Sequence, residues 1–188
     1  QLLAHDQLTT LPSGQAGVLH DLAVGVGPDG ADAWMHQELL ALDIEVGAPP
    51  DNFNTDGQCW GLPPFIPWKL RAAGYQPLAE QWRAVMQRGQ GIRIDHVMGL
   101  FRLYWVPAGH SARDGGYVRY RGDELLAVLA VESHRAGALV VGEDLGTVEE
   151  GTYTIICTIP GHADSGMTGQ LVVTGDAASV ELAAEGDH

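Results

Sequence analysis

The chain has 188 residues and a formal net charge of −14, because ten Lys and Arg stand against 24 Asp and Glu. Phosphate backbones and anionic lipids would repel a chain this acidic, so we expect it to bind neither nucleic acid nor a membrane surface. The longest uninterrupted apolar stretch, Leu125 to Val131, is far shorter than the ~20 residues that a membrane span needs, which favours a soluble protein.

The first ten residues and the two cysteines bear on the cellular compartment. Residues 1–10 contain neither the basic region nor the apolar region of a secretory signal, so we expect a cytoplasmic protein. The absence of an initiating Met suggests that the natural chain starts further upstream. Cys59 and Cys157 lie far apart in unlike surroundings, which indicates neither a disulfide framework nor a zinc ribbon.

The first part of the chain alternates short apolar runs with helix-length segments. Three of the runs end in a polar residue, and we expect strands at residues 18–22, 91–95 and 139–143. Apolar residues recur at helical spacing between them, which predicts helices at residues 77–88 and 122–136. This order is typical of βα units in a parallel sheet.

Between these elements lies a segment, residues 48–68, that is too rich in Pro and Gly for either regular element. Long structured loops usually have a function. Asp51 and Gln58 supply polar groups, and the indoles of Trp60 and Trp68 could stack on pyranose rings, so the segment would suit a sugar. The alternative is a packed lid whose aromatic side chains fill the core.

The composition changes near residues 147–151, because all ten Lys and Arg precede this point. Two β-rich runs follow, at residues 152–157 and 170–174, and they look like part of an all-β domain. The final residues are acidic or small, which predicts a flexible tail. We therefore expect three parts, at residues 1–149, 150–175 and 176–188.

Asp95 and Glu143 each close an apolar strand, and in a parallel α/β barrel the reacting groups project from such strand ends. Arg93 shares a strand face with Asp95, so its guanidinium could hold that carboxylate ionised. Two carboxylates on neighbouring strands could lie about 5 Å apart, as in retaining glycosyl-transfer enzymes. The alternative is a structural ion pair between Arg93 and Asp95. His20 and Asp21 end the first strand similarly, where loop anchoring, helix capping and a site role are all open.

Four motifs lie in order along residues 18–149. They are His-Asp-Leu-Ala-Val-Gly-Val at 20–26, Gly-Ala-Pro-Pro-Asp with Gly-Gln-Cys-Trp-Gly within 47–61, Arg-Ile-Asp-His-Val-Met-Gly-Leu at 93–100 and Gly-Glu-Asp-Leu-Gly at 142–146. In this order and spacing they resemble the 4-alpha-glucanotransferases (amylomaltases) of glycoside hydrolase family 77. The resemblance implies an α/β fold, namely a partial (β/α)8 TIM barrel of about three βα units.

The same resemblance implies a retaining double displacement on maltodextrins or other alpha-1,4-glucans, with neither a metal nor an organic cofactor. In that reaction Asp95 would be the nucleophile and Glu143 the general acid/base. Arg93 and His96 would orient the nucleophile and the glucose at the cleaved bond. The residues that would contact further sugars are Asp51, Gln58, Trp60 and Asp144.

The chain departs from the family in what it lacks. It supplies about three of the eight barrel strands, and a third carboxylate, which in the family follows a His-Asp motif in a later strand, has no counterpart here. Open parallel edges with apolar faces are poorly stable alone. We therefore expect an enzyme fragment with little or no activity.

A second resemblance concerns residues 151–174. Cys157, His162 and Met167 follow the spacing Cys-x4-His-x4-Met between two predicted strands, and a thiolate, an imidazole and a thioether on one loop suit a type 1 copper site. The segment looks like the C-terminal end of a cupredoxin, which implies copper-dependent electron transfer as an alternative function. The other interpretation is a buried Cys, a capping His and a core Met.

A type 1 copper site also needs a second His from an earlier strand. The nearest upstream histidine, His134, lies on a predicted helix, so we expect any copper binding to be weak or non-blue. Two unrelated families that meet at residues 148–151 without a linker would make the chain a chimera.

Overall fold

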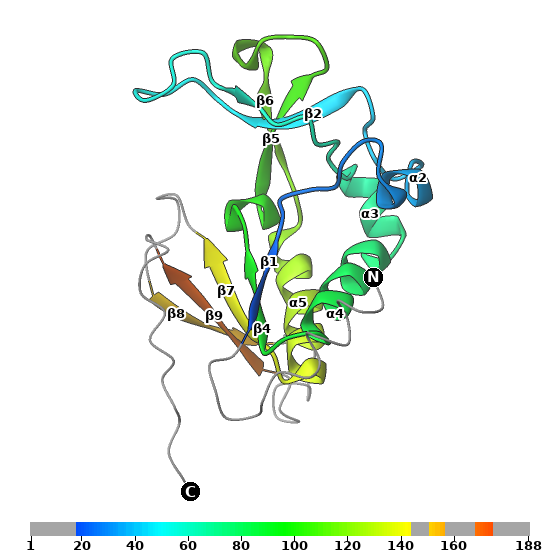
Figure 1. The fold of residues 1–188 in the computed structure, drawn as a ribbon, viewed down its shortest axis with the longest axis vertical. Helices are drawn as coiled ribbons and strands as arrows, with labels where there is room; N and C mark the ends of the chain where they lie inside the picture. Colours follow the sequence, from blue (N-terminus) through cyan, green and yellow to red (C-terminus); the bar gives the residue numbers. More distant parts are fainter. Residues whose placement is uncertain (1–17, 144–150, 157–167, 175–188) are drawn as a thin grey trace, which may run out of the picture.

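The computed structural model describes residues 18–143, 151–156 and 168–174, which form two β-sheets with helices packed beside them (Figure 1). Among these residues no helix is both long enough and apolar enough to cross a bilayer. The tail expected at residues 176–188 lies outside the described residues, and the expected division into three parts stays a prediction.

The larger sheet contains the three strands expected before residue 144. In spatial order its members are β1 (Leu19–Leu22), β4 (Gly91–Ile94), β7 (Leu139–Glu143), β9 (Thr168–Thr174) and β8 (Gly151–Ile156). The first four run parallel, and β8 returns antiparallel to β9. The β-rich runs expected after residue 150 are therefore confirmed as strands, and they extend the same sheet.

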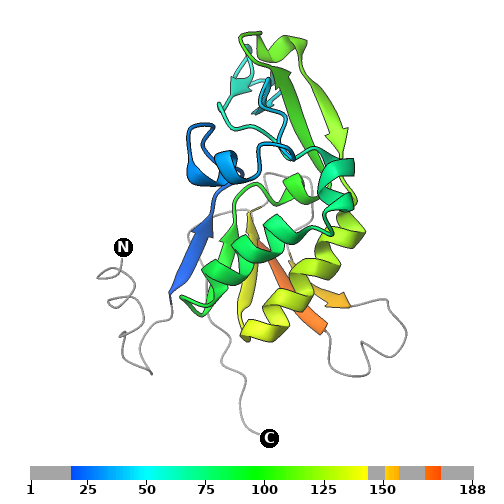
Figure 2. The same ribbon diagram turned by 90° about the vertical axis from the view of Figure 1, so that its right-hand side faces the viewer.

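Two helices cover one face of this sheet, as Figure 2 shows: α4 (Gln76–Met86) and α5 (Gly122–Ala136). Both helices were expected from the spacing of apolar residues, and the structure confirms them. Pro77 lies in the first turn of α4, where a missing backbone donor costs nothing. Asp123 and Glu124 lie in the first turn of α5, where negative charge favours the helix terminus.

An ion pair between a half-exposed arginine and a buried carboxylate joins the two helices. Glu132 of α5 is only 3% exposed, and its carboxylate accepts hydrogen bonds from Arg83 of α4 at 2.7 and 2.8 Å and from Arg135 at 2.9 Å. The hydrogen bond from Arg83 lowers the pKa of Glu132 most strongly. An unpaired carboxylate at this depth would be costly, so the pairing allows α4 and α5 to pack closely.

The main core lies between the helices and the larger sheet. The strands contribute branched aliphatic side chains and the helices contribute larger ones. The members with the least exposure are Trp82, Leu70, Met86, Ile92, Leu125, Leu129, Val97 and Val140. Because these side chains come from strands and helices far apart in sequence, their burial fixes the helices on one face of the sheet.

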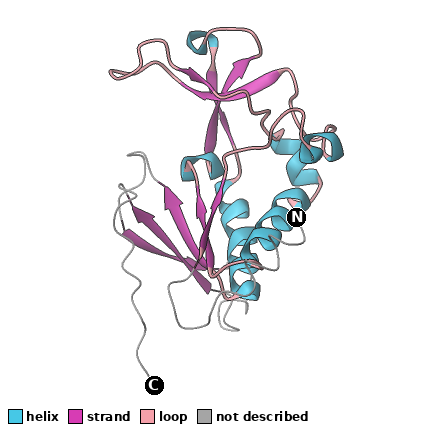
Figure 3. Ribbon diagram, in the orientation of Figure 1, coloured by secondary structure: helices cyan, strands magenta, loops and turns pink. Residues whose placement is uncertain are grey.

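The smaller sheet is antiparallel and was not expected from the sequence. Its order is β3 (Gln58–Cys59), β2 (Ile44–Ala48), β5 (Arg102–Pro107) and β6 (Gly116–Arg119). Figure 3 shows it as a separate group of strands beyond the ends of the larger sheet. The helix α2 (Ala31–Met35) and the short 3-10 turns η1 (Val97–Leu100) and η2 (Ala112–Asp114) complete the connections.

The expectation that residues 48–68 contain no regular element is partly wrong. Ala48 ends β2, β3 lies within the segment, and α3 (Pro67–Ala72) begins at its end. Gly47 explains how β3 pairs with β2, because a Cβ there would lie 2.0 Å from the carbonyl oxygen of Gln58. Only glycine permits that approach.

Candidate active site

Four charged side chains meet across β1, β4 and β7. Arg93 lies opposite Asp21 in the parallel register of β1 and β4, and Asp95 and Glu143 lie at the carboxyl ends of β4 and β7. Nη1 of Arg93 is 2.8 Å from Oδ1 of Asp21 and 3.5 Å from Oδ1 of Asp95, while Nη2 donates to Oε1 of Glu143. The three side chains expected to act together are therefore brought together.

The two carboxyl groups interact directly and their pKa values shift in opposite directions. A hydrogen bond with Glu143, burial and repulsion by Glu143 raise the pKa of Asp95 to about 6, and Arg93 only partly offsets them. The same hydrogen bond lowers the pKa of Glu143, helped by the backbone N–H of His96 and by Arg93. Of the two carboxyls, Asp95 therefore keeps its proton to the higher pH, up to about 6.

Arg93 favours the ionised form of Asp95, as expected, but the hydrogen bond with Glu143 and burial outweigh it and raise the pKa of Asp95. Arg93 makes its hydrogen bonds to Asp21 and Glu143 and lies farther from Asp95, so its charge favours the ionised form of Glu143 more directly. The expected ion pair of Arg93 and Asp95 is the longest of the three contacts. Which of the three carboxylates lies nearest to Arg93 depends on side-chain positions, and strand periodicity does not determine these.

His96 joins the carboxylates to the Pro- and Gly-rich segment. Its backbone is left-handed, with φ 53°, and its N–H donates to Oε2 of Glu143 at 3.1 Å. Its imidazole is 9% exposed and meets the ring of Trp60 edge-on, with the ring centroids 5.3 Å apart. Nε1 of Trp60 donates in turn to Oε1 of Gln58 at 2.9 Å. Gln58, Trp60 and His96 therefore form one connected row that ends at Glu143.

Asp51 has a different local role. Its Oδ1 accepts hydrogen bonds from the backbone N–H groups of Phe53 at 2.7 Å and Asn54 at 2.6 Å, which closes a tight Asx turn. The side chains of Phe53 and Trp68 are 101% and 67% exposed, so the aromatics of this segment do not all fill the core. The packed-lid interpretation is therefore wrong for these two residues.

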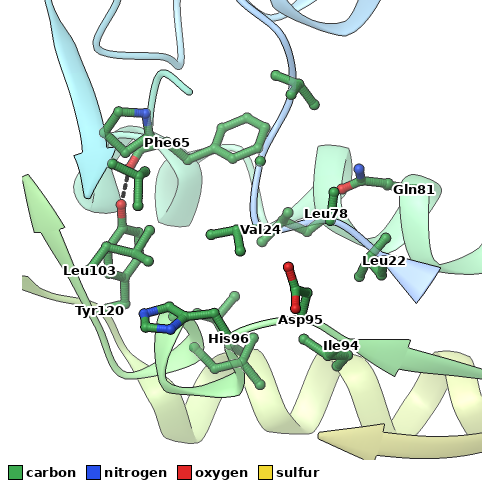
Figure 4. Close-up of a pocket in the computed structure, with 18 of the residues that line it drawn as sticks. Leu22, Val24, Phe65, Leu78, Gln81, Ile94, Asp95, His96, Leu103 and Tyr120 are labelled. Carbon is green, nitrogen blue, oxygen red and sulfur yellow. Dashed lines mark hydrogen bonds between the residues drawn. The ribbon is translucent and has the colours of Figure 1, made fainter. Parts of the chain in front are cut away.

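A cavity of about 740 Å³, counting its open mouth, lies beside Asp95 and His96. Figure 4 shows Asp95 and His96 on one side and Phe65 on the other, with Val24 between them. The hydroxyl of Tyr120 donates to the carbonyl oxygen of Phe65 at 2.6 Å and holds the far wall. The side chains that line the cavity are mostly aliphatic and aromatic. The cavity therefore adjoins Asp95 and His96 but is largely apolar.

Two residues whose roles were open now have definite contacts. Asp21 accepts a hydrogen bond from Arg93 and belongs to the charged cluster, which its position opposite Arg93 in a parallel register could have indicated. His20 anchors a loop, because its Nε2 lies 3.0 Å from the carbonyl oxygen of Arg88.

Several expected site residues lie outside the described residues. They are Asp144, Cys157, His162 and Met167. Among the residues that the structure does describe, no three His, Cys, Asp or Glu side chains are arranged to hold a metal ion. The cluster of Asp21, Asp95 and Glu143 is instead neutralised in part by Arg93.

The chain is similar to known enzymes over most of its length. The model of glycoside hydrolase family 77, described as 4-alpha-glucanotransferase, matches residues 1–159. A 4-alpha-glucanotransferase of Mycobacterium tuberculosis (strain H37Rv) is 49% identical over 148 residues, which are 78% of this chain and 20% of that protein. One of Haemophilus influenzae is 46% identical over 156 residues, with 80% and 22% covered. The chain thus spans about a fifth of these relatives' length.

Two solved structures share the fold. The crystal structure of amylomaltase from Corynebacterium glutamicum aligns with a TM-score of 0.76 at 40% identity, covering 92% of this chain and 24% of that one. Amylomaltase from Streptococcus agalactiae in complex with acarbose aligns with a TM-score of 0.63 at 25% identity, covering 71% and 28%.

The extent of these matches bears on the expected junction at residues 148–151. The family match passes it and ends at residue 159, and a structural match over 92% of the chain is longer than residues 1–149 alone. These matches do not support a cupredoxin-like chimera. The α/β fold is instead that of part of an amylomaltase, and the chain belongs to the 4-alpha-glucanotransferases of glycoside hydrolase family 77.

Proposed function

We propose that this chain carries the nucleophile and the acid/base of a 4-alpha-glucanotransferase, which transfers alpha-1,4-glucan segments between maltodextrins. The observation that supports this most directly is the pair of carboxyls, Asp95 and Glu143, in contact at the ends of adjacent parallel strands and bridged by Arg93. Family membership supports this assignment, since the strand ends carry the chemistry in such barrels.

In the proposed reaction the glycosidic oxygen enters between the two carboxyls. Glu143 donates a proton to that oxygen as the bond to C1 breaks, and Asp95 forms a bond to C1, giving a glycosyl-enzyme. The 4-hydroxyl of a second glucan then attacks C1, gives its proton to Glu143 and releases Asp95. One proton on Glu143 is enough for this cycle, because Glu143 recovers from the attacking hydroxyl the proton that it gave to the leaving oxygen.

The surrounding residues supply binding and orientation. The indole of Trp60 offers an apolar face to a glucose ring, and Gln58 fixes the plane of that indole through its hydrogen bond. His96 and Arg93 orient the carboxylates from two sides. Asp51 and Asp144 are proposed as further sugar contacts by resemblance to the family. Acarbose, found in the Streptococcus agalactiae structure, is a suitable probe of this site.

Trp60→Ala is expected to weaken binding of maltotetraose to the chain at least about tenfold, because it removes the aromatic face and the contact with His96. Isothermal titration calorimetry measures this directly. Trp34→Ala is the matched control, since Trp34 is 75% exposed on α2 and should leave the affinity unchanged. Equal affinities for the Trp60 variant and the wild type would exclude Trp60 from the sugar site.

The chain by itself is expected to convert maltotriose to glucose and longer dextrins at a barely detectable rate. It spans about a fifth of its relatives' length, and the third carboxylate implied by the family has no counterpart in it. Chromatography of the products from wild type and Glu143→Gln measures the rate. Formation of both products by the wild type but not by the variant would overturn the expected inactivity and support the assigned acid/base.

The copper alternative rests on Cys157, His162 and Met167 alone. It is not favoured, because the family match extends through residue 159 and so includes Cys157. An intense thiolate-to-copper absorption band after addition of copper, abolished by Cys157→Ser, would support this alternative.

A further inference from the structure

The 3-10 turn η2 is firmly attached to the smaller sheet. Ala112 is 3% exposed and packs with Tyr104 and Val106 of β5. The hydroxyl of Tyr104 donates to the carbonyl oxygen of Ala112 at 2.8 Å, and the hydroxyl of Ser111 accepts from the N–H of Arg113 at 3.2 Å. These contacts make η2 a fixed point on the scaffold.

Residues 51–57, here called the 51–57 loop, rest on this turn. Gly57 has φ 74°, and a Cβ there would lie 2.7 Å from Cβ of Ala112, so the loop backbone approaches η2 as closely as glycine allows. Nη2 of Arg113 donates to the carbonyl oxygen of Thr55 at 2.6 Å and to Oδ1 of Asp56 at 3.2 Å. One guanidinium thus connects the fixed turn to two consecutive loop residues.

The end of this loop leads directly into the row of Gln58, Trp60 and His96, which is proposed to bind sugar. Gln58 follows Gly57, and Trp60 lies two residues further, against His96. At the other end Asp51 closes its turn, while the tip at Phe53 is fully exposed. Arg113 therefore holds the end of the loop that continues into Gln58, where the chain also pairs with β2.

We propose that Arg113 is a positioning residue for glucan binding: by bridging η2 to Thr55 and Asp56 it holds the 51–57 loop so that Trp60 keeps its place beside His96. The inference rests on the proposed function for the role of Trp60 and adds a residue outside the row of sugar contacts. Arg113 acts through the loop backbone and needs no contact with the sugar itself.

The expected size of the effect of losing Arg113 follows from the exposure of the side chains that it joins. The side chains of Arg113 and Asp56 are 59% and 87% exposed, so their ion pair alone contributes little. The hydrogen bond to the Thr55 carbonyl restrains the backbone as well, because ordering loop residues costs conformational entropy. Loss of both contacts should open the loop about fivefold more often.

Three variants test the inference: Arg113→Ala, Arg113→Lys and Arg119→Ala. Lysine keeps the charge and can reach one acceptor at a time, so it should restore part of the effect. Arg119 is an exposed arginine on β6 of the same sheet, so its loss controls for the change in charge. Maltotetraose affinity is measured by calorimetry, and loop opening by amide exchange at hydrogen-bonded loop residues. These amides are Asp51, Phe53, Asn54 and Gly57.

For Arg113→Ala we expect exchange about fivefold faster and affinity about fivefold weaker, with Arg113→Lys between this variant and the wild type and Arg119→Ala unchanged. An unchanged amide exchange rate in Arg113→Ala would show that Arg113 does not restrain the 51–57 loop, which overturns the inference. Faster exchange with unchanged affinity would overturn its role in glucan binding. Weaker affinity with unchanged exchange would mean that Arg113 contacts the sugar itself, which also overturns the inference.

A wild-type chain that binds no maltotetraose would contradict the proposed function separately. In that case the NMR signal of the Trp60 indole N–H, which is hydrogen-bonded to Gln58, decides the inference. Its displacement in Arg113→Ala together with faster exchange would support positioning of Trp60 by Arg113. An unmoved signal would overturn it.

Discussion

Asp95→Asn is expected to stabilise the chain at pH 8 and to have little effect near pH 4. The pKa of Asp95 is raised from 3.8 to about 6, so the folded state binds this proton more tightly than the unfolded state. The stability that the proton contributes is fully present below pH 3.8 and is lost as the pH rises through about 6. Above that pH the ionised Asp95 repels Glu143, and an amide at this position would not.

The shift of about two pKa units corresponds to about 3 kcal/mol. The side chain of Asp95 is 41% exposed, so solvent screening reduces the expected gain to about 1–2 kcal/mol, or about 2–8 °C in the midpoint of thermal unfolding. Circular dichroism melts of the wild type and Asp95→Asn at the two pH values measure this difference.

The net charge of −14 makes a control necessary, because removing any acid could relieve general repulsion. Asp43→Asn removes one exposed acid away from the charged cluster. A gain at pH 8 as large for Asp43→Asn as for Asp95→Asn would assign the effect to net charge. A less stable Asp95→Asn at pH 8 would contradict the proposed repulsion between Asp95 and Glu143 directly.

Trp82→Ala is expected to destabilise the chain by about 3–5 kcal/mol, because Trp82 is 2% exposed and fills the core between α4 and the larger sheet. That loss is comparable with the whole stability of many small domains, so a substantial unfolded fraction is expected without denaturant. Urea unfolding followed by circular dichroism measures it, and Trp82→Phe should fall between the two proteins because it leaves a smaller cavity.

Trp34→Ala serves as the matched control for this substitution. Its indole is 75% exposed, so the same chemical change should alter the free energy of unfolding by less than about 0.5 kcal/mol. Similar urea midpoints for Trp82→Ala and Trp34→Ala would show that the packing around Trp82 contributes little.

The results for Asp95→Asn and Trp82→Ala would show that the fold is stabilised by its apolar core and destabilised at the candidate site. The core formed by the helices and the larger sheet stabilises the fold through buried apolar surface. The carboxyl pair of Asp95 and Glu143 destabilises the fold at neutral pH, since two like charges lie close together at the strand ends. A site that gains stability when Asp95, the proposed nucleophile, is neutralised is consistent with selection for chemistry.

The elements of the larger sheet could be predicted because their signals are local. The runs at β1, β4 and β7 are short and apolar, and α5 repeats apolar residues at helical spacing. The smaller sheet lacks such signals. β2 contains Gly47 and Ala48, and its existence depends on antiparallel pairing with β5, about 60 residues further along the chain.

The candidate site divides in the same way. The sequence alone determined that Asp95 and Glu143 each close a short apolar strand, because strand length and side-chain period are local properties. Only the tertiary structure decided that Asp95 and Glu143 lie on adjacent strands, which partners Arg93 takes, which carboxyl has the higher pKa, and that Trp60 meets His96. Those outcomes depend on distances of a few ångströms between side chains from different strands and loops, and electrostatic and packing energies change steeply over such distances.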